Sequence, residues 1–200
     1  MGSKLKTILS LPQRTERMAA LAQWAQSLYS NREDRPVIVG GTALELYTGG
    51  AYRTGDLDFV GTLTPSVEET LIEAGFRQFG QHWIHKEERV FLVFQDSALE
   101  KGRRAVERYF GVYRVLVISP EDLLIDRLVS WKYCESPLHG VQAYLLYCGT
   151  HWWMNVGHLN ERAVQDEVEF ALDSLLKLFF QSKGQVPAGD LLGAWATRGV

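Results

Sequence analysis

The sequence predicts an α+β chain in which short strands alternate with helices as far as about residue 118, and helices alone follow. Short apolar runs bounded by turn residues, such as Val37–Val39 and Phe91–Phe94, are typical of buried strands. From Ser119 onward the apolar residues recur at helical spacing. Hydrophobic residues make up 46% of the chain and charged residues 22%, which is ordinary for a protein with a packed core.

A chain of 200 residues suits one domain, or one domain with a helical appendage. We expect an α/β domain over residues 1–118, which includes an N-terminal helix, and a helical part over residues 119–183. Glycine and proline then predict a loose tail over residues 184–200, although its apolar residues could dock on the helices.

Charge and composition disfavour several classes of function. The net charge of −3 gives no global basic field, so an RNA-binding domain without nucleotide chemistry is the least favoured class. No apolar run reaches the roughly 18 residues that a membrane span needs, and no apolar segment follows Lys4 and Lys6, so we expect neither a membrane partner nor a secretory signal. Cys134 and Cys148 form no metal motif, and we expect both to be reduced core residues of a cytoplasmic protein.

The first elements lead to a pair of glycines. Helical spacing predicts an amphipathic helix over Gln13–Ser30, and a buried strand follows at Val37–Val39. Gly40 and Gly41 come next, with Thr42 as the expected N-cap of a short helix that ends at Tyr47. Without side chains, the glycines let a ligand approach the backbone, and the N–H groups of the helix favour an anion. The alternative is a tight turn that binds nothing.

A second strand, expected over Asp56–Val60, carries two aspartates. Side chains alternate along a strand, so the carboxylates of Asp56 and Asp58 should project from one face. Aspartate is costly to bury without a compensating charge, and Mg²⁺ is typically held by one or two carboxylates together with substrate phosphates. We therefore favour a magnesium and phosphate site over the alternative, a solvated edge strand.

The remaining elements follow from spacing and capping signals. A helix is expected over residues 65–74, and strands are expected over residues 76–84, 89–95 and 113–118. The charged run at residues 97–108 predicts a solvated helix or loop rather than a phosphate-binding patch. Ser119 and Pro120 predict a helix start, and further helices are expected up to residue 134, from about residue 137 to 147, and over residues 160–180.

Two stretches carry a resemblance to a known family. Residues 37–60 read V-I-V-G-G-T-A-L-E-L-Y-T-G-G-A-Y-R-T-G-D-L-D-F-V, and residues 118–128 read I-S-P-E-D-L-L-I-D-R-L. They resemble the DNA polymerase β-like nucleotidyltransferase superfamily, especially its bacterial minimal members related to the toxins of type IV toxin–antitoxin systems. The resemblance implies a nucleotidyltransferase fold, which is a mixed β-sheet flanked by helices with a helical C-terminal part.

The resemblance also implies site residues and partners. Asp56 and Asp58 would hold Mg²⁺ and carry catalysis, and a nucleoside triphosphate would contact Gly40, Gly41, Thr42 and Arg53. Lys132 could also reach the triphosphate, although exposed helix lysines are common. The acceptor would be an RNA, a protein side chain or a small molecule, and a toxin would have a cognate antitoxin as its partner.

One departure from the family pattern divides the hypotheses. The superfamily takes a third carboxylate from a neighbouring strand, here residues 90–95, and the acid would fall near Val93. That strand has no acid, and Glu88 and Asp96 only flank it. The chain is therefore either a magnesium-dependent nucleotidyltransferase or a catalytically weakened module that binds nucleotide or a partner protein.

Overall fold

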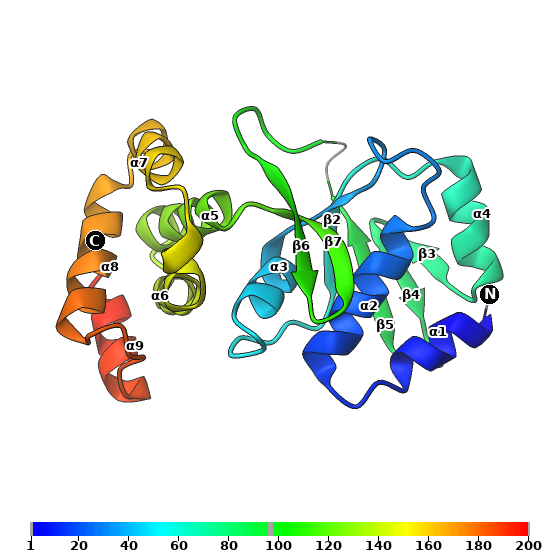
Figure 1. The fold of residues 1–200 in the computed structure, drawn as a ribbon, viewed down its shortest axis with the longest axis horizontal. Coiled ribbons are helices and arrows are strands. Elements are labelled where there is room, and N and C mark those ends of the chain that lie inside the picture. Colours follow the sequence, from blue (N-terminus) through cyan, green and yellow to red (C-terminus); the bar gives the residue numbers. More distant parts are fainter. Residues whose placement is uncertain (1, 96–97, 200) are drawn as a thin grey trace. The chain divides into compact units, whose positions relative to one another are not determined.

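The computed structural model describes residues 2–95 and 98–199, which form two compact units. We call them the sheet unit, Met1–Leu46 with Arg53–Ile118, and the helical unit, Tyr47–Tyr52 with Ser119–Val200. The predicted α+β class, with a mixed sheet flanked by helices and a helical C-terminal part, is confirmed (Figure 1).

The sheet unit contains one mixed sheet in its described residues. Its helices are α1 (Gly2–Leu9), α2 (Arg14–Gln26), α3 (Gly40–Tyr47) and α4 (Pro65–Glu73), the last residue of α3 being assigned to the helical unit. Its strands are β1 (Val37–Ile38), β2 (Leu57–Val60), β3 (Arg77–Phe79), β4 (His82–His85), β5 (Val90–Phe94), β6 (Ala105–Phe110) and β7 (Tyr113–Ile118). They follow the order β3-β4-β5-β2-β1-β7-β6, with β1–β7 and β2–β5 parallel and the other pairs antiparallel.

Alternation along the strands separates a buried face from the face that carries Asp58. Leu57 and Phe59 of β2 are almost fully buried, and the Phe59 ring stacks on Phe94 of β5 with ring centroids 5.2 Å apart. Asp58 lies between these two residues and is half-buried. The strand therefore anchors the unit with one face and presents a carboxylate on the other.

A buried glutamine of α2 forms hydrogen bonds with the backbone of β7 beyond the end of the short strand β1. Gln26 Nε2 donates to Pro36 O at 2.8 Å and to Leu116 O at 2.7 Å, and Gln26 Oε1 accepts from Leu116 N at 2.9 Å. Pro36 has no N–H group and cannot extend the ladder to β7. The glutamine amide takes the place of that missing backbone partner, so α2 packs against β7 (Figure 1).

Two predictions for the strands of the sheet unit differ from the structure, and one helix was missed. The charged run expected as a helix or loop contains strand β6, because its charged side chains lie on an exposed edge strand that alternation leaves partly solvated. Residues 76–84 form two strands rather than one, with a turn at Gly80, whose φ of +62° favours glycine. Helix α1 was not predicted.

The helical unit contains α5 (Pro120–Tyr133), α6 (Pro137–Thr150), the short 3₁₀ helix His151–Trp153, α7 (Val156–Gln165), α8 (Glu169–Gln181) and α9 (Gly189–Arg198). The predicted start of α5 is confirmed, since Ser119 is its N-cap and Pro120 its first residue. The helix expected over residues 160–180 is two helices, because the chain turns at Glu167 with φ +55°. Where a loose tail was expected, α9 docks with Leu192 buried, and Trp131 Nε1 donates to Ala196 O at 2.8 Å.

The cysteines differ from expectation in one respect. Both are free, but Cys134 is exposed just after α5 and is not a core residue. Cys148 of α6 is half-buried, and burial raises the pKa of its thiol. The thiol form is thereby favoured at neutral pH.

A buried aspartate ties α5 to α7. Asp122 accepts from Ser119 Oγ at 2.7 Å, and its other oxygen lies 3.0 Å from His158 Nε2 and 3.4 Å from Arg162 Nε. Arg162 also contacts Asp166 at 2.7 Å. A buried carboxylate is stable only with such partners, so the interface between these helices is polar and specific.

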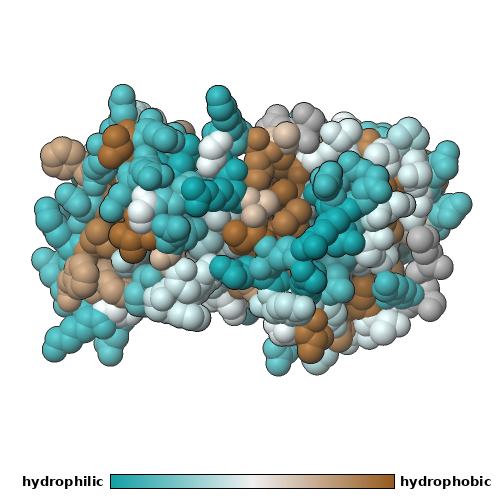
Figure 2. All heavy atoms as spheres, turned by 45° about the horizontal axis from the view of Figure 1, so that its top comes forward, coloured by the Kyte–Doolittle hydropathy of each residue, from teal (hydrophilic) through white to brown (hydrophobic). Residues whose placement is uncertain are grey.

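The exposed apolar surface is divided into patches. Figure 2 shows hydrophobic residues (brown) separated by hydrophilic ones (teal) on the face drawn. Scattered exposed apolar side chains are usual for folded proteins. Among residues 2–95 and 98–199, no helix combines the length and the apolar character needed to cross a membrane.

We expect Ser119→Ala to lower the free energy of unfolding by about 1–2 kcal/mol, because Ser119 Oγ accepts from Asp122 N and donates to the buried Asp122 carboxylate. Urea denaturation measures this. The control is Ser136→Ala, at the N-cap of α6, where the side chain makes no capping hydrogen bond. Equal losses in the two variants would contradict the role assigned to Ser119.

Candidate functional site

The turn from β1 into α3 closes on the carboxylate of Asp58. Helix α3 begins at Gly40, whose φ is +59°. A Cβ atom at this position would lie 2.9 Å from Asp58 Oδ2, so both the backbone conformation and the space require glycine. Gly41 N then donates to Asp58 Oδ2 at 3.1 Å. The fold thus brings the glycine pair into direct contact with Asp58, which lies seventeen residues after Gly41.

Thr42 does not have the capping role predicted for it. The helix begins two residues earlier, and Thr42 is fully buried inside its first turn. Its hydroxyl donates to Asp56 O and accepts from Asp58 N, each at 2.8 Å. The side chain joins α3 to the start of β2 because it satisfies two backbone groups that flank Leu57. This prediction was therefore wrong, although the residue belongs to the predicted site.

The two aspartates do not both lie in the strand. Strand β2 begins at Leu57, and Asp56 occupies the bend directly before it. Both residues are half-buried. The alternation argument therefore applies to Asp58, whereas the position of Asp56 depends on the bend and on the bond from Thr42 Oγ1 to its carbonyl.

An ion pair between a half-exposed arginine and a buried glutamate holds the segment before the bend. Glu45 of α3 has a fully buried side chain that accepts from Arg14 Nε at 2.9 Å and from Thr54 N at 2.8 Å. Arg14 Nη2 also donates to Thr54 O. Sequence reasoning missed this pair, although an acid inside the apolar run A-L-E-L-Y signals a buried partner.

The position beside Asp58 on the neighbouring strand is apolar. Asp58 of β2 pairs in register with Val93 of β5, and Val93 pairs in turn with His82 of β4. Neighbouring strands lie about 4.8 Å apart, so Val93 is the residue of β5 nearest to Asp58. His82 is exposed one strand further away.

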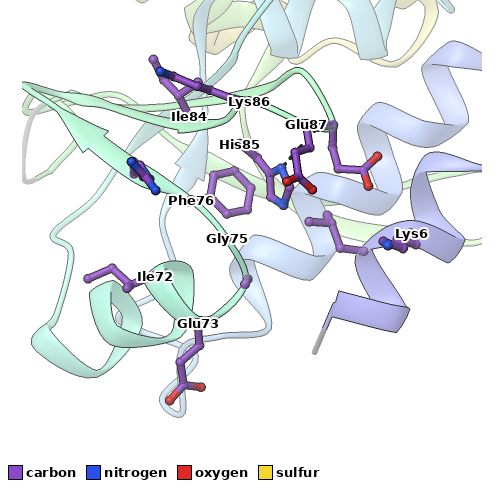
Figure 3. A pocket seen from close by; sticks show the side chains of 13 residues that line it. Lys6, Ile72, Glu73, Gly75, Phe76, Ile84, His85, Lys86 and Glu87 are labelled. Atoms are coloured by element: carbon purple, nitrogen blue, oxygen red, sulfur yellow. Dashed lines mark hydrogen bonds between the residues drawn. The ribbon is translucent and has the colours of Figure 1, made fainter.

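Of the two proposed substitutes for a third acid, the described residues include only Glu88. It lies in the turn that precedes β5, whereas Val93, the residue beside Asp58, lies near the other end of that strand. Glu88 lines a cavity of about 710 Å³ in which Figure 3 shows the His85 ring between Phe76 and Glu87. Asp96 lies outside the described residues. Within residues 2–95 and 98–199, no three metal-ligating side chains come together.

The other two predicted residues lie outside this contact network. Arg53 is exposed in the segment before Thr54. Lys132 belongs to the helical unit, where its amine donates to Glu167 O and to Tyr133 OH and lies 4.6 Å above the Tyr133 ring centroid. The structure thus brings together Gly40, Gly41, Thr42, Asp56 and Asp58.

The donor set suits one kind of metal site. Asp56 and Asp58 are hard oxygen donors, which magnesium prefers, and Asp58 Oδ2 is oriented by the Gly41 N–H. Two carboxylates are too few for a closed protein cage. They fit Mg²⁺ that arrives with phosphate oxygens as its further ligands.

Comparisons with known proteins support the fold. No family model and no curated protein matches the chain. The structure of an antigenic nucleotidyltransferase-like protein from Paracoccidioides brasiliensis superimposes with a TM-score of 0.53 and 17% sequence identity, covering 82% of this chain and 92% of that one. The predicted nucleotidyltransferase fold is therefore confirmed, and at this identity the likeness concerns the fold alone.

We expect Gly40→Ala to destabilise the protein more than Gly111→Ala, by about 1–3 kcal/mol. The two glycines have nearly the same φ, +59° and +62°, so both variants incur the cost of a left-handed alanine. Only at Gly40 would the new Cβ meet Asp58, since nothing lies within 4 Å at Gly111. Thermal or urea unfolding measures the difference, and indistinguishable losses would contradict the close contact.

Proposed function

We propose that this chain is a nucleotide-binding protein of the nucleotidyltransferase fold, with a magnesium site of two carboxylates and a weakened capacity for transfer. The observation that carries the proposal is the position of Asp58. Its carboxylate accepts the Gly41 N–H at the glycine turn, which favours a metal and phosphate site, and its neighbour on β5 is Val93 rather than an acid.

Binding follows from the chemistry of the assembled residues. Asp56 and Asp58 would hold Mg²⁺, and a phosphate bound to the metal would lie at the N-terminal end of α3, where the helix dipole favours an anion. Arg53 is exposed and would add a positive charge for the triphosphate.

Weak transfer follows from the proton that the reaction must move. In nucleotidyl transfer the acceptor hydroxyl bonds to the α-phosphorus, the bond to the β-phosphate oxygen breaks, and pyrophosphate leaves with the electron pair. Bound Mg²⁺ would neutralise the charge that develops on the phosphates. The hydroxyl proton needs a base, and the side chain of Val93 cannot accept it.

A second candidate function is full nucleotidyl transfer to an RNA, a protein side chain or a small molecule, in a toxin controlled by an antitoxin. The half-buried positions of Asp56 and Asp58 favour it, because both remain partly accessible to a substrate. Incubation with α-labelled nucleotides and cell extract separates the two candidates. Label on an acceptor that is lost in Asp56→Ala supports transfer.

We expect the wild-type protein to bind a non-hydrolysable ATP or GTP analogue in the presence of Mg²⁺ and Asp58→Asn to bind it at least about tenfold more weakly. The variant keeps the shape of the side chain but removes the negative charge that a hard cation requires. Titration calorimetry measures the affinity. Asp34→Asn is the control, since Asp34 is exposed in another loop of the sheet unit. Absent binding, or equal loss in both variants, would contradict the proposal.

We expect Val93→Asp to raise the Mg²⁺-dependent affinity for nucleotide by about tenfold and to increase label transfer, because it places a third carboxylate beside Asp58. His82→Asp is the matched control. His82 pairs in register with Val93, so the variant adds the same charge at the same level of the sheet but one strand further from Asp58. Circular dichroism verifies the fold of both variants. A folded Val93→Asp protein that behaves like His82→Asp would overturn this explanation of weak transfer.

A further inference from the structure

The sheet unit has a second polar hollow, on the side where α2 meets β7. We call it the arginine hollow and define it by Arg32, Arg35, Glu107 and Arg114. Its volume is about 350 Å³, at the lower end of the range of roughly 300–1,000 Å³ that is common for ligand pockets. Gln26 fixes one wall through its bonds to Leu116 and Pro36, so the hollow is built on ordered elements.

Positive charge exceeds negative charge in the arginine hollow. Arg32 and Arg114 both donate to the same oxygen, Glu107 Oε2. The hydrogen bond from Arg114, followed by the charges of Arg114 and Arg32, lowers the pKa of the Glu107 carboxyl. Glu107 therefore stays ionised at neutral pH and offsets one of three guanidinium charges. The local excess contrasts with the net charge of −3 for the chain.

Arg35 supplies the observation that points to a ligand. Arg35 lines the hollow, and its buried Nε makes no hydrogen bond to a residue in the described part of the chain. A buried donor without an acceptor is unfavourable, and a charged one more so. The planar guanidinium fork matches the oxygens of a phosphate, to which arginine often binds through two parallel hydrogen bonds.

We propose that the arginine hollow binds a phosphate group, with Arg35 as the principal donor and with Arg32 and Arg114 as flanking charges. The site is distinct from the one at Asp58. Strand β1 lies between β2, which carries Asp58, and β7, which carries Arg114, and Arg114 precedes by four residues the position of β7 that aligns with Asp58. The Cα atoms are therefore roughly 16 Å apart. The proposal does not depend on nucleotide binding at Asp58.

Titration calorimetry of the whole protein with inorganic phosphate, at fixed ionic strength set by chloride, tests the site. We expect saturable binding by the wild-type protein and about tenfold or weaker affinity in Arg35→Ala. Arg77→Ala is the control, because Arg77 is an exposed arginine on β3 outside the hollow. Arg35→Lys keeps the positive charge but loses the guanidinium fork. Its affinity for phosphate should therefore lie between that of the wild-type protein and that of Arg35→Ala.

The source of the phosphate follows from a second pair of probes, a short RNA with a 5′-phosphate and the same RNA with a 5′-hydroxyl. Binding of the 5′-phosphorylated RNA that is tighter than that of both the 5′-hydroxyl RNA and inorganic phosphate assigns the site to nucleic-acid ends. Binding of the phosphorylated RNA no tighter than that of inorganic phosphate assigns the site to free phosphate. Circular dichroism establishes that each variant is folded. Absent saturable phosphate binding by the wild-type protein, or equal affinities for Arg35→Ala and Arg77→Ala, would overturn the proposal.

Discussion

The contact between the Gly40–Gly41 turn and the Asp58 carboxylate organises the sheet unit. Gly40 must be glycine because its φ is positive and because a Cβ would meet the carboxylate. Gly41 N–H orients the same carboxylate, and Thr42 joins the helix to the backbone around β2. Three consecutive residues thus place an acid beside a helix start, which is where a metal-bound phosphate is most easily accommodated.

A second layer of contacts makes this arrangement rigid. The buried carboxylate of Glu45 is satisfied by Arg14 and by the Thr54 amide, so the segment before Asp56 is fixed against α3. Removing one partner would leave a buried charge uncompensated. The same fold places Val93 beside Asp58, and a valine can neither bind a cation nor accept a proton. The firm positioning of Asp58 and the weak transfer that we propose would both follow from the local structure.

Local signals explain which features were predictable from the sequence. The glycine pair, the two nearby aspartates and the Ser119–Pro120 helix start each depend on residues close in sequence, and the absent acid near Val93 could be noted once a family pattern was available. Thr42 was misassigned because its partners, Asp56 O and Asp58 N, lie 14 and 16 residues further along the chain. Glu45 was missed because its partner Arg14 is 31 residues away. Strand β6 was hidden because its charges resemble those of a solvated loop, whereas pairing with β7 decides its structure.

We propose that Asp56 and Asp58 bind a metal together with the phosphates of a nucleotide held at the glycine turn. Crystals grown with Mn²⁺ in place of Mg²⁺ and a non-hydrolysable nucleoside triphosphate provide the decisive test, because anomalous scattering locates the metal. We expect a metal bound by oxygens of both aspartates and by phosphate oxygens that lie against Gly40 and Gly41. A nucleotide bound elsewhere, or a metal that Asp58 does not contact, would contradict it.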